Sequence, residues 1–194
     1  MTDEGTAYVG TGPRTRDHEP ARAHLEREFG ARIKNLRVNH GHLDLTVEPH
    51  NLVEIVTFLR DASGFEMRFF TFLSGVDRSE FGPDDAEAKP HPLEVLIHLY
   101  SPENVLHATL HVPVDPANPV CPTISDVFGG ARWAERETHE MFGIHFEGHP
   151  GLVNLYLPED FEGHPLLKSF KIPTRMVKDW PGAKDPEEAA AGGR

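Results

Sequence analysis

The segment 131–142 carries the densest set of side chains that could do chemistry. Within six positions it holds Glu135, Arg136, Glu137, His139 and Glu140. His139 followed by Glu140 would begin a zinc-protease motif, which requires a second histidine four residues after the first. That position is Gly143, so the motif is broken. Acid–base catalysis would need a second carboxylate or a nucleophile at a recognisable spacing, and the pattern supplies neither.

A helix must position these side chains. We predict that it spans residues 131–142 and ends at Gly143, because glycine is favoured just after a helix C-terminus. At about 100° per residue, Glu137 falls between Trp133 and Met141, inside the predicted apolar stripe. Burying an isolated carboxylate is costly, so Glu137 must be paired, hydrogen-bonded or protonated. Three interpretations stay open: a catalytic acid/base, a structural carboxylate that fixes the following loop, and a carboxylate completed by groups of a partner chain.

A second group of metal-binding side chains follows this helix. His145, His149 and His164 lie in a Gly/Pro-rich segment. Three imidazoles can hold zinc, and a freestanding zinc hydrolase is therefore a rival hypothesis. A stoichiometric metal in the purified chain would favour that enzyme. Neither cysteine nor helical spacing orders these histidines, which weakens the hypothesis.

Further histidines lie on two predicted strands, residues 93–100 and 105–114, which a turn at 101–104 connects. They are His98, His107 and His111. The apolar/polar alternation places His107 and His111 on the polar face of their strand. This placement favours solvated histidines over a metal site.

The remaining periodic segments indicate an α+β fold with a mainly antiparallel sheet and helices on one face. We predict helices at 21–29 and from Pro49 to Gly64, a hairpin of strands 32–38 and 43–47, and a strand at 65–73. The acidic, proline-containing stretch 77–92 is predicted to be a loop between strands. We predict four parts of the chain: a disordered leader (1–20), the α+β domain with the charged helix (21–143), an extended partner-binding arm (144–178) and a mobile tail (179–194).

Composition limits the function. The chain has 194 residues and a formal net charge of −12, which disfavours binding to nucleic acid or to an acidic membrane surface. Its one cysteine, Cys121, cannot form an internal disulfide or supply the usual four thiolates of an iron–sulfur cluster. Residues 1–12 have neither an apolar signal core nor a basic leader, and the longest apolar run is too short to span a bilayer. We expect a cytoplasmic chain with no cluster of its own.

The residues around the charged helix resemble a known family. The resemblance rests on Glu135-Arg136-Glu137, Glu140-Met141-Phe142-Gly143, His149-Pro150, Ser125-Asp126-Val127-Phe128, Gly130-Ala131-Arg132-Trp133, Leu157-Pro158, Glu162-Gly163-His164-Pro165-Leu166 and Lys168. Together they look like the signature of the C subunit of type I NADH:quinone oxidoreductase, respiratory complex I. The match is dense over residues 123–170. Two segments depart from the pattern. Val153-Asn154 stands where the family usually has a basic pair, and Leu167-Lys168-Ser169 stands where it tends to have a Leu-Arg-Lys-Asp run.

The resemblance implies a cofactor-free subunit of the hydrophilic arm of a proton-pumping complex, with no active site of its own. NADH, FMN, iron–sulfur clusters and quinone would be bound by other subunits. The chain would pack against the hydrogenase-related D subunit and cluster-bearing neighbours, on the cytoplasmic side of the membrane and without direct membrane insertion. The residues expected to contact partners are Glu135, Arg136, Glu137, Phe142, His149, Leu155, His164 and Lys168. The alternative is an equivalent subunit of a membrane-bound hydrogenase or of a dehydrogenase complex with another electron donor.

Overall fold

The computed structural model describes residues 18–80 and 92–172. The predicted tail (179–194) lies outside these ranges, and so does nearly all of the predicted leader (1–20). Most of the predicted 77–92 loop lies outside them as well. The strands are β1 (Ile33–Asn39), β2 (His42–Val47), β3 (Phe69–Asp77), β4 (Leu93–Ser101), β5 (Leu106–Pro113), β6 (Val120–Pro122) and β7 (His145–Glu147). The α-helices are α1 (Glu19–Phe29), α2 (Leu52–Asp61) and α3 (Ala131–Phe142), with short 3-10 turns at Gly30–Arg32 and Pro49–Asn51.

Five strands form one sheet in the order β1-β2-β5-β4-β3. All neighbours in it are antiparallel except β2 and β5, which run parallel. Strands β6 and β7 form a separate parallel pair. The sheet is mainly antiparallel, and the predicted α+β class is confirmed.

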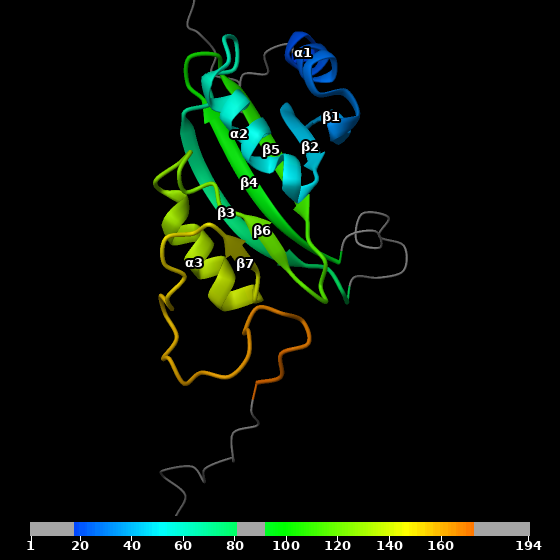
Figure 1. Ribbon diagram of the computed structural model, residues 1–194. Helices are drawn as coiled ribbons and strands as arrows, with labels where there is room; N and C mark the ends of the chain where they lie inside the picture. The colour runs from blue at the N-terminus through cyan, green and yellow to red at the C-terminus, as the bar shows by residue number, and fades with distance from the viewer. Residues whose placement is uncertain (1–17, 81–91, 173–194) are drawn as a thin grey trace, which may run out of the picture.

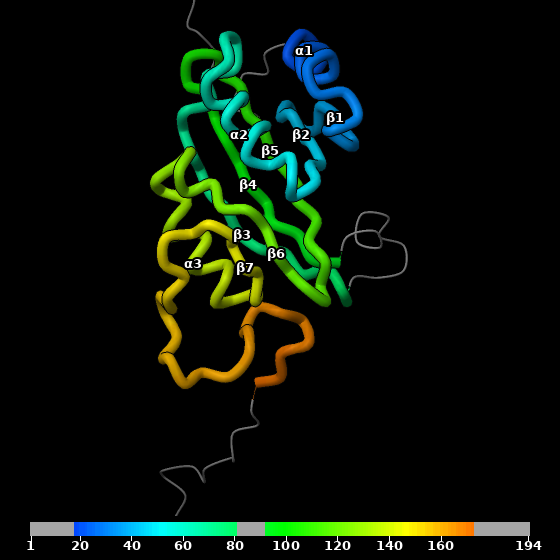
Figure 2. Tube along the Cα trace, in the orientation of Figure 1, coloured from blue at the N-terminus to red at the C-terminus, as the bar shows by residue number. Residues whose placement is uncertain are grey.

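The hydrophobic core lies against one face of the sheet. Val95, Ile97, Leu110 and Val112 are fully buried there, while the alternate residues of the same strands are more exposed. The buried residues of α1, α2 and α3 join the same apolar cluster. Figures 1 and 2 show the three helices against this face, with α1 and α2 near one end and α3 over β3. The prediction that the helices cover one face is therefore confirmed, and the other face of the sheet has no helix from the described residues against it.

Most predicted elements match the observed ones within a few residues, and the strand predicted at 65–73 is the main exception. It begins four residues later, at Phe69. Phe65 and Met67 are buried, but they lie in an irregular connection in which Glu66 has a left-handed φ of 38°. Their apolar character reflects core packing rather than strand pairing, and periodicity alone does not separate these two causes.

The chain after β7 follows the surface of α3. Residues 148–172, called the arm segment below, contain no helix or strand. They form a series of turns below α3 in Figure 1. None of the helices in the described ranges has both the length and the apolar character needed to cross a lipid bilayer.

Candidate functional site

Helix α3 is the element that organises the charged segment. It begins after Gly129-Gly130 and ends at Gly143, whose φ of 75° is left-handed and favours glycine. The bounds of 131–142 predicted from the sequence are confirmed. The helix packs on β3 through Phe142, whose ring lies against Gly75. A Cβ added at Gly75 would come within 2.5 Å of that ring, so this close approach requires glycine.

The predicted burial of Glu137 is wrong. Glu137 is exposed, and Trp133 is 61% exposed. The buried residues are instead Ala131, Glu135, Thr138 and Phe142 on one face, and Glu140 on the opposite side of the helix, where residues 155–157 cover it. The predicted stripe centres on the large apolar ring of Trp133, but two glutamates elsewhere on the helix have internal hydrogen-bond partners that allow them to be buried.

Glu135 is fully buried in the first half of α3. Its carboxylate accepts hydrogen bonds from the Thr123 hydroxyl and, at 2.7 Å, from the Ile124 backbone N–H. Burial raises the pKa of Glu135, and the two hydrogen bonds oppose that rise. Thr123 also accepts a hydrogen bond from the Ser125 N–H, so its hydroxyl links the turn ahead of α3 to the Glu135 carboxylate.

Glu140 holds the arm segment. Its side chain accepts hydrogen bonds from three consecutive backbone N–H groups: Leu155 at 3.0 Å, Tyr156 at 3.0 Å and Leu157. Burial alone would raise the pKa of Glu140, but these N–H groups and the nearby Arg136 guanidinium lower it overall. The carboxylate is therefore ionised at neutral pH, and it fixes a segment that has no secondary structure of its own.

Arg136 ties the same segment at a second point. Its guanidinium donates to the backbone carbonyls of Val153 and Asn154, each at 2.8 Å. It also lies over the exposed ring of Trp133, 5.1 Å from the ring centroid. Arg136 therefore already has partners within its own chain.

Two histidines connect helix α3 to the loops around it. His149 Nε2 lies 3.2 Å from the Arg132 carbonyl oxygen, while its Nδ1 accepts from the Gly151 N–H at 3.0 Å. His149 Nε2 also lies 3.9 Å from the Glu135 carboxylate. His164 Nδ1 lies 2.8 Å from the Glu140 carbonyl oxygen near the helix end. These contacts make each imidazole a bridge between helix and loop.

His145, His149 and His164 form no metal-binding group in the part of the chain that the structure describes. His145 is exposed, and the other two use ring nitrogens on backbone groups. The positions of these three histidines therefore give no support to the zinc hydrolase hypothesis.

Phe142 and His164 line a groove where the arm segment meets the end of β3 and the start of β4, and Lys168 lies between two of its lining residues in the chain, whereas Leu155 lies against Glu140. The volume of the groove is about 570 Å³, and Asp77, Phe142, His164 and Leu167 are among the residues that line it. Asp77 accepts a hydrogen bond from the backbone N–H of Lys168 at 2.8 Å, while the Lys168 residue itself is exposed.

Exposed apolar side chains lie on both α3 and the arm segment. They are called the exposed apolar surface here and comprise Trp133 on α3 with Val153, Tyr156, Leu166 and Ile172 on the arm segment, each more than half exposed. Single exposed apolar residues are normal on a protein surface, but a group on one helix and its attached segment is typical of a binding surface. Glu137 also lies on the exposed side of α3. The internal residues build the scaffold, and the exposed ones are available to a partner.

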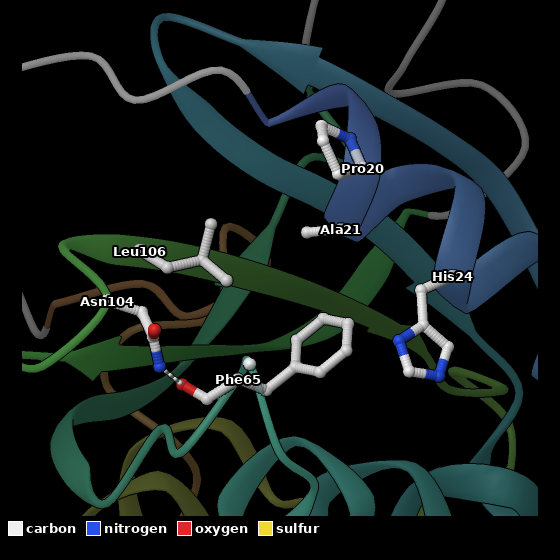
Figure 3. A pocket seen from close by; sticks show the side chains of 7 residues that line it. Pro20, Ala21, His24, Phe65, Asn104 and Leu106 are labelled. Carbon is white, nitrogen blue, oxygen red and sulfur yellow. Dashed lines mark hydrogen bonds between the residues drawn. The ribbon is translucent and has the colours of Figure 1, made fainter.

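A second cavity lies at the other end of the fold and has a different character. It measures about 260 Å³, and α1 and the start of β5 contribute to its lining. Figure 3 shows His24, Phe65 and Leu106 at its wall, with Asn104 donating to the Phe65 carbonyl oxygen at 3.2 Å. The amide of Asn104 is thus engaged by the fold, and the described lining brings no pair of catalytic groups together.

A family model matches the part of the chain that includes α3. The family model described as "Respiratory-chain NADH dehydrogenase, 30 Kd subunit" matches residues 45–176. The chain belongs to this family. The C subunit of NADH-quinone oxidoreductase from Herpetosiphon aurantiacus is 38% identical over 172 residues, which cover 85% of this chain and 96% of the relative. The corresponding protein from Mesorhizobium japonicum is 40% identical and covers 76% of this chain and 68% of the relative.

Two solved structures have a similar fold. The trypsin-resistant fragment of Nqo5 matches with a TM-score of 0.54 and 25% identity, over 69% of this chain and 95% of the fragment. A chain from the membrane-bound sulfane sulfur reductase, an archaeal respiratory membrane complex, matches with a TM-score of 0.62. At 21% identity, over 84% of this chain and 95% of the other, this second likeness concerns the fold alone.

In this member of the 30 kDa subunit family, sequence reasoning missed how the buried carboxylates are used. It predicts that Glu137 lies in the core, whereas Glu135 and Glu140 are the buried residues. It also predicts that Asp77 belongs to a loop, although Asp77 ends β3 and binds the arm segment. The available signal for Glu135 was its spacing from Ala131 and Phe142, which share one helix face. Glu140 lies on the opposite side of the helix and is buried only because the arm segment covers it.

Proposed function

We propose that this chain is a cofactor-free structural subunit of a proton-pumping NADH:quinone oxidoreductase, with no active site of its own. It belongs to the hydrophilic arm, on the cytoplasmic side of the membrane, where it is held peripherally through the complex. Its role is to position the D subunit and the cluster-bearing neighbours. Electron transfer from NADH to quinone then depends on this chain indirectly, because the chain sets the relative positions of those subunits.

The observation that carries this proposal is the exposed apolar surface built on α3 and the arm segment. Glu140 and Arg136 fix the backbone of the arm segment at residues 153–157. Trp133 and Tyr156 remain exposed on this fixed scaffold, at 61% and 63%. Large aromatic residues dominate the binding energy of many interfaces, and a backbone that is already ordered lowers the entropic cost of association.

Family membership supports the identity of the complex. The relatives described above are C subunits of NADH-quinone oxidoreductase, and one of them aligns over nearly its whole length. A subunit of such a complex acts within a hetero-oligomer. The single cysteine is consistent with a subunit that lies among cluster-bearing neighbours without holding a cluster.

The test is assembly measured separately from folding. Trp133→Ala, Tyr156→Ala and Glu137→Ala remove exposed side chains, so we expect the thermal unfolding of the isolated chain to be nearly unchanged. In membranes from cells that carry only the variant, we expect less assembled complex on native gels and lower NADH:quinone reductase activity. Val53→Ala is the matched control, because Val53 is an exposed apolar residue on α2, away from α3.

Two results would contradict the proposal. One is full-strength complex and activity with a Trp133→Ala/Tyr156→Ala double variant. The other is a pull-down from membranes, analysed by mass spectrometry, that recovers hydrogenase subunits or other dehydrogenase subunits in place of the D subunit.

A further inference from the structure

Three histidines meet on the sheet face opposite the helices. His42 begins β2, His98 lies in β4 and His107 lies in β5, so the three come from three adjacent strands. One ring nitrogen from each residue lies within 4.8 Å of the corresponding atoms of the other two. Within the described ranges, no other group of three His, Cys, Asp or Glu residues has metal-ligand spacing.

Strand register explains why these residues converge. In the antiparallel β4–β5 pair, His98 is opposite Thr109 and Tyr100 is opposite His107, so the two histidines are diagonal neighbours. In the parallel β2–β5 pair, Leu43 is opposite Ala108, which sets His42 beside His107 one residue earlier. His98 and His107 alternate with buried residues of their strands, and His42 precedes the fully buried Leu43, so all three lie on the face opposite the core.

The rings form an imidazole cluster held between aromatic side chains. His107 stacks on His42 at a centroid distance of 4.5 Å and on Tyr100 at 4.3 Å. His98 stacks on Phe72 at 5.7 Å. These contacts restrict where the rings can move while leaving them side by side.

The hydrogen-bonding state of the cluster points to a ligand. Nδ1 of His98 and Nδ1 of His107 are buried and have no hydrogen-bond partner. Buried polar nitrogens are normally satisfied, so such atoms call for an explanation such as a bound ion. The neighbouring His18 repeats the pattern, because both of its ring nitrogens are buried without a partner.

The electrostatic surroundings favour neutral imidazoles. Burial lowers the pKa of His98 to about 4, with His107 and His42 adding to the effect. Burial also lowers the pKa of His42 and of His107, and His18 contributes to both shifts. A neutral imidazole carries the lone pair that a metal ion requires.

We propose that His42, His98 and His107 form a binding site for a divalent transition-metal ion of the zinc class. Three imidazole ligands with one further position match the ligand set of sites for such ions. At Zn–N distances of about 2.0–2.1 Å, nitrogens on a tetrahedral ion are about 3.3 Å apart. The three nitrogens now lie within 4.8 Å of one another, so the proposal requires the rings to rotate about their side-chain torsions, away from the present stacking, until they reach this separation.

A bound ion would link three strands on the open face of the sheet. Strands β4 and β5 are consecutive in the chain, whereas α2 and β3 lie between β2 and β4. An ion that binds only the folded chain stabilises it in proportion to the logarithm of its concentration relative to the dissociation constant. The site lies across the sheet from the α3 surface and makes no use of the residues assigned to assembly.

The test uses the full chain without a histidine tag. Calorimetric titration with zinc chloride should show tight binding of one equivalent of zinc. Addition of cobalt(II) should give a visible d–d absorption band. His98→Gln and His107→Gln should each weaken zinc binding by at least about tenfold, because each removes one ligand. His50→Gln and His145→Gln are matched controls, since both histidines are exposed and lie outside the cluster.

Thermal unfolding gives a second measurement. Zinc should raise the unfolding temperature of the wild-type chain and of the two controls, but not that of the cluster variants. His42→Gln removes the third proposed ligand and should have the same effect. Absence of one-equivalent binding by the wild-type chain would overturn the proposal. Wild-type affinity in folded cluster variants, checked by circular dichroism, would overturn it as well.

Discussion

At the scale of single residues, the buried carboxylates of α3 are stable because the backbone satisfies them. Glu140 accepts from three consecutive backbone N–H groups, and Glu135 accepts from a hydroxyl and one N–H. A buried carboxylate without such partners would be protonated or would destabilise the fold. These two residues therefore attach the neighbouring loops to the helix.

We predict that Glu140→Gln weakens the attachment of the arm segment. The amide replaces one acceptor oxygen with an N–H₂ donor that faces backbone N–H donors. The free energy of unfolding should fall by about 1–3 kcal/mol, measured by urea denaturation. Hydrogen exchange at residues 155–157 should become faster. Glu137→Gln is the control, because Glu137 is exposed on the same helix; equal effects of the two substitutions would contradict the assignment.

A second prediction concerns His111. Its imidazole lies 3.1 Å from Asp44 and 3.2 Å from Glu94, and hydrogen bonds to these carboxylates raise its pKa from 6.5 to about 9. Because the folded-state pKa exceeds the unfolded value, this stabilisation is fully present below about pH 6.5 and is lost as pH rises through about 9. The free energy of unfolding should therefore decline between about pH 6.5 and about pH 9.5.

Denaturation at a series of pH values checks this expectation. His111→Asn should remove most of the decline while lowering stability at about pH 6.5. An NMR titration of the His111 ring that finds a midpoint at or below its ordinary value would contradict the predicted ion pairs.

At the scale of elements, the contact between α3 and β3 depends on one close approach. Phe142 fills the space over Gly75, where a Cβ would lie 2.5 Å from the ring. Well-packed interiors do not yield to an added methyl group without moving an element. This contact sets the position of α3 on the sheet and, through Glu140, the position of the arm segment.

We therefore predict that Gly75→Ala destabilises the chain by about 1–3 kcal/mol. Adding Phe142→Leu to Gly75→Ala should restore part of that loss, because the smaller side chain makes room for the methyl group. Gly129→Ala is the control, since a Cβ there meets no atom within 4 Å. Thermal unfolding of these variants and of Phe142→Leu alone measures the coupling, and strictly additive effects of the two substitutions would rule out the proposed contact.

At the scale of the whole molecule, the core and the arm segment are energetically distinct. Every fully buried apolar residue of the described core lies between Leu25 and Phe146, whereas the arm segment contributes only the partly buried Leu152 and Leu167. The arm segment is held mainly by hydrogen bonds to α3 and to Asp77. Folding therefore depends on the sheet and its helices, and the proposed assembly surface depends on the added segment.

We predict that a chain ending at Glu147 still folds cooperatively but no longer enters the complex. Circular dichroism and urea denaturation would measure folding, and native gels of membranes would measure assembly. In the shortened chain, Glu140→Gln should cost much less than in the full chain, because the N–H groups that donate to the carboxylate have been removed. A shortened chain without a cooperative transition would contradict the division into core and arm segment.

Local sequence patterns were sufficient for the helix at 131–142, the first hairpin, the alternation in β4 and β5, and the family signature, because each depends on residues close together in the chain. Which side of α3 is buried was decided only by tertiary structure, since Glu135 needs Thr123 and Glu140 needs residues 155–157. The meeting of His42, His98 and His107 likewise depends on the register of three strands. Alternation assigns a residue to a face, but only pairing between distant segments decides which residues on that face are neighbours.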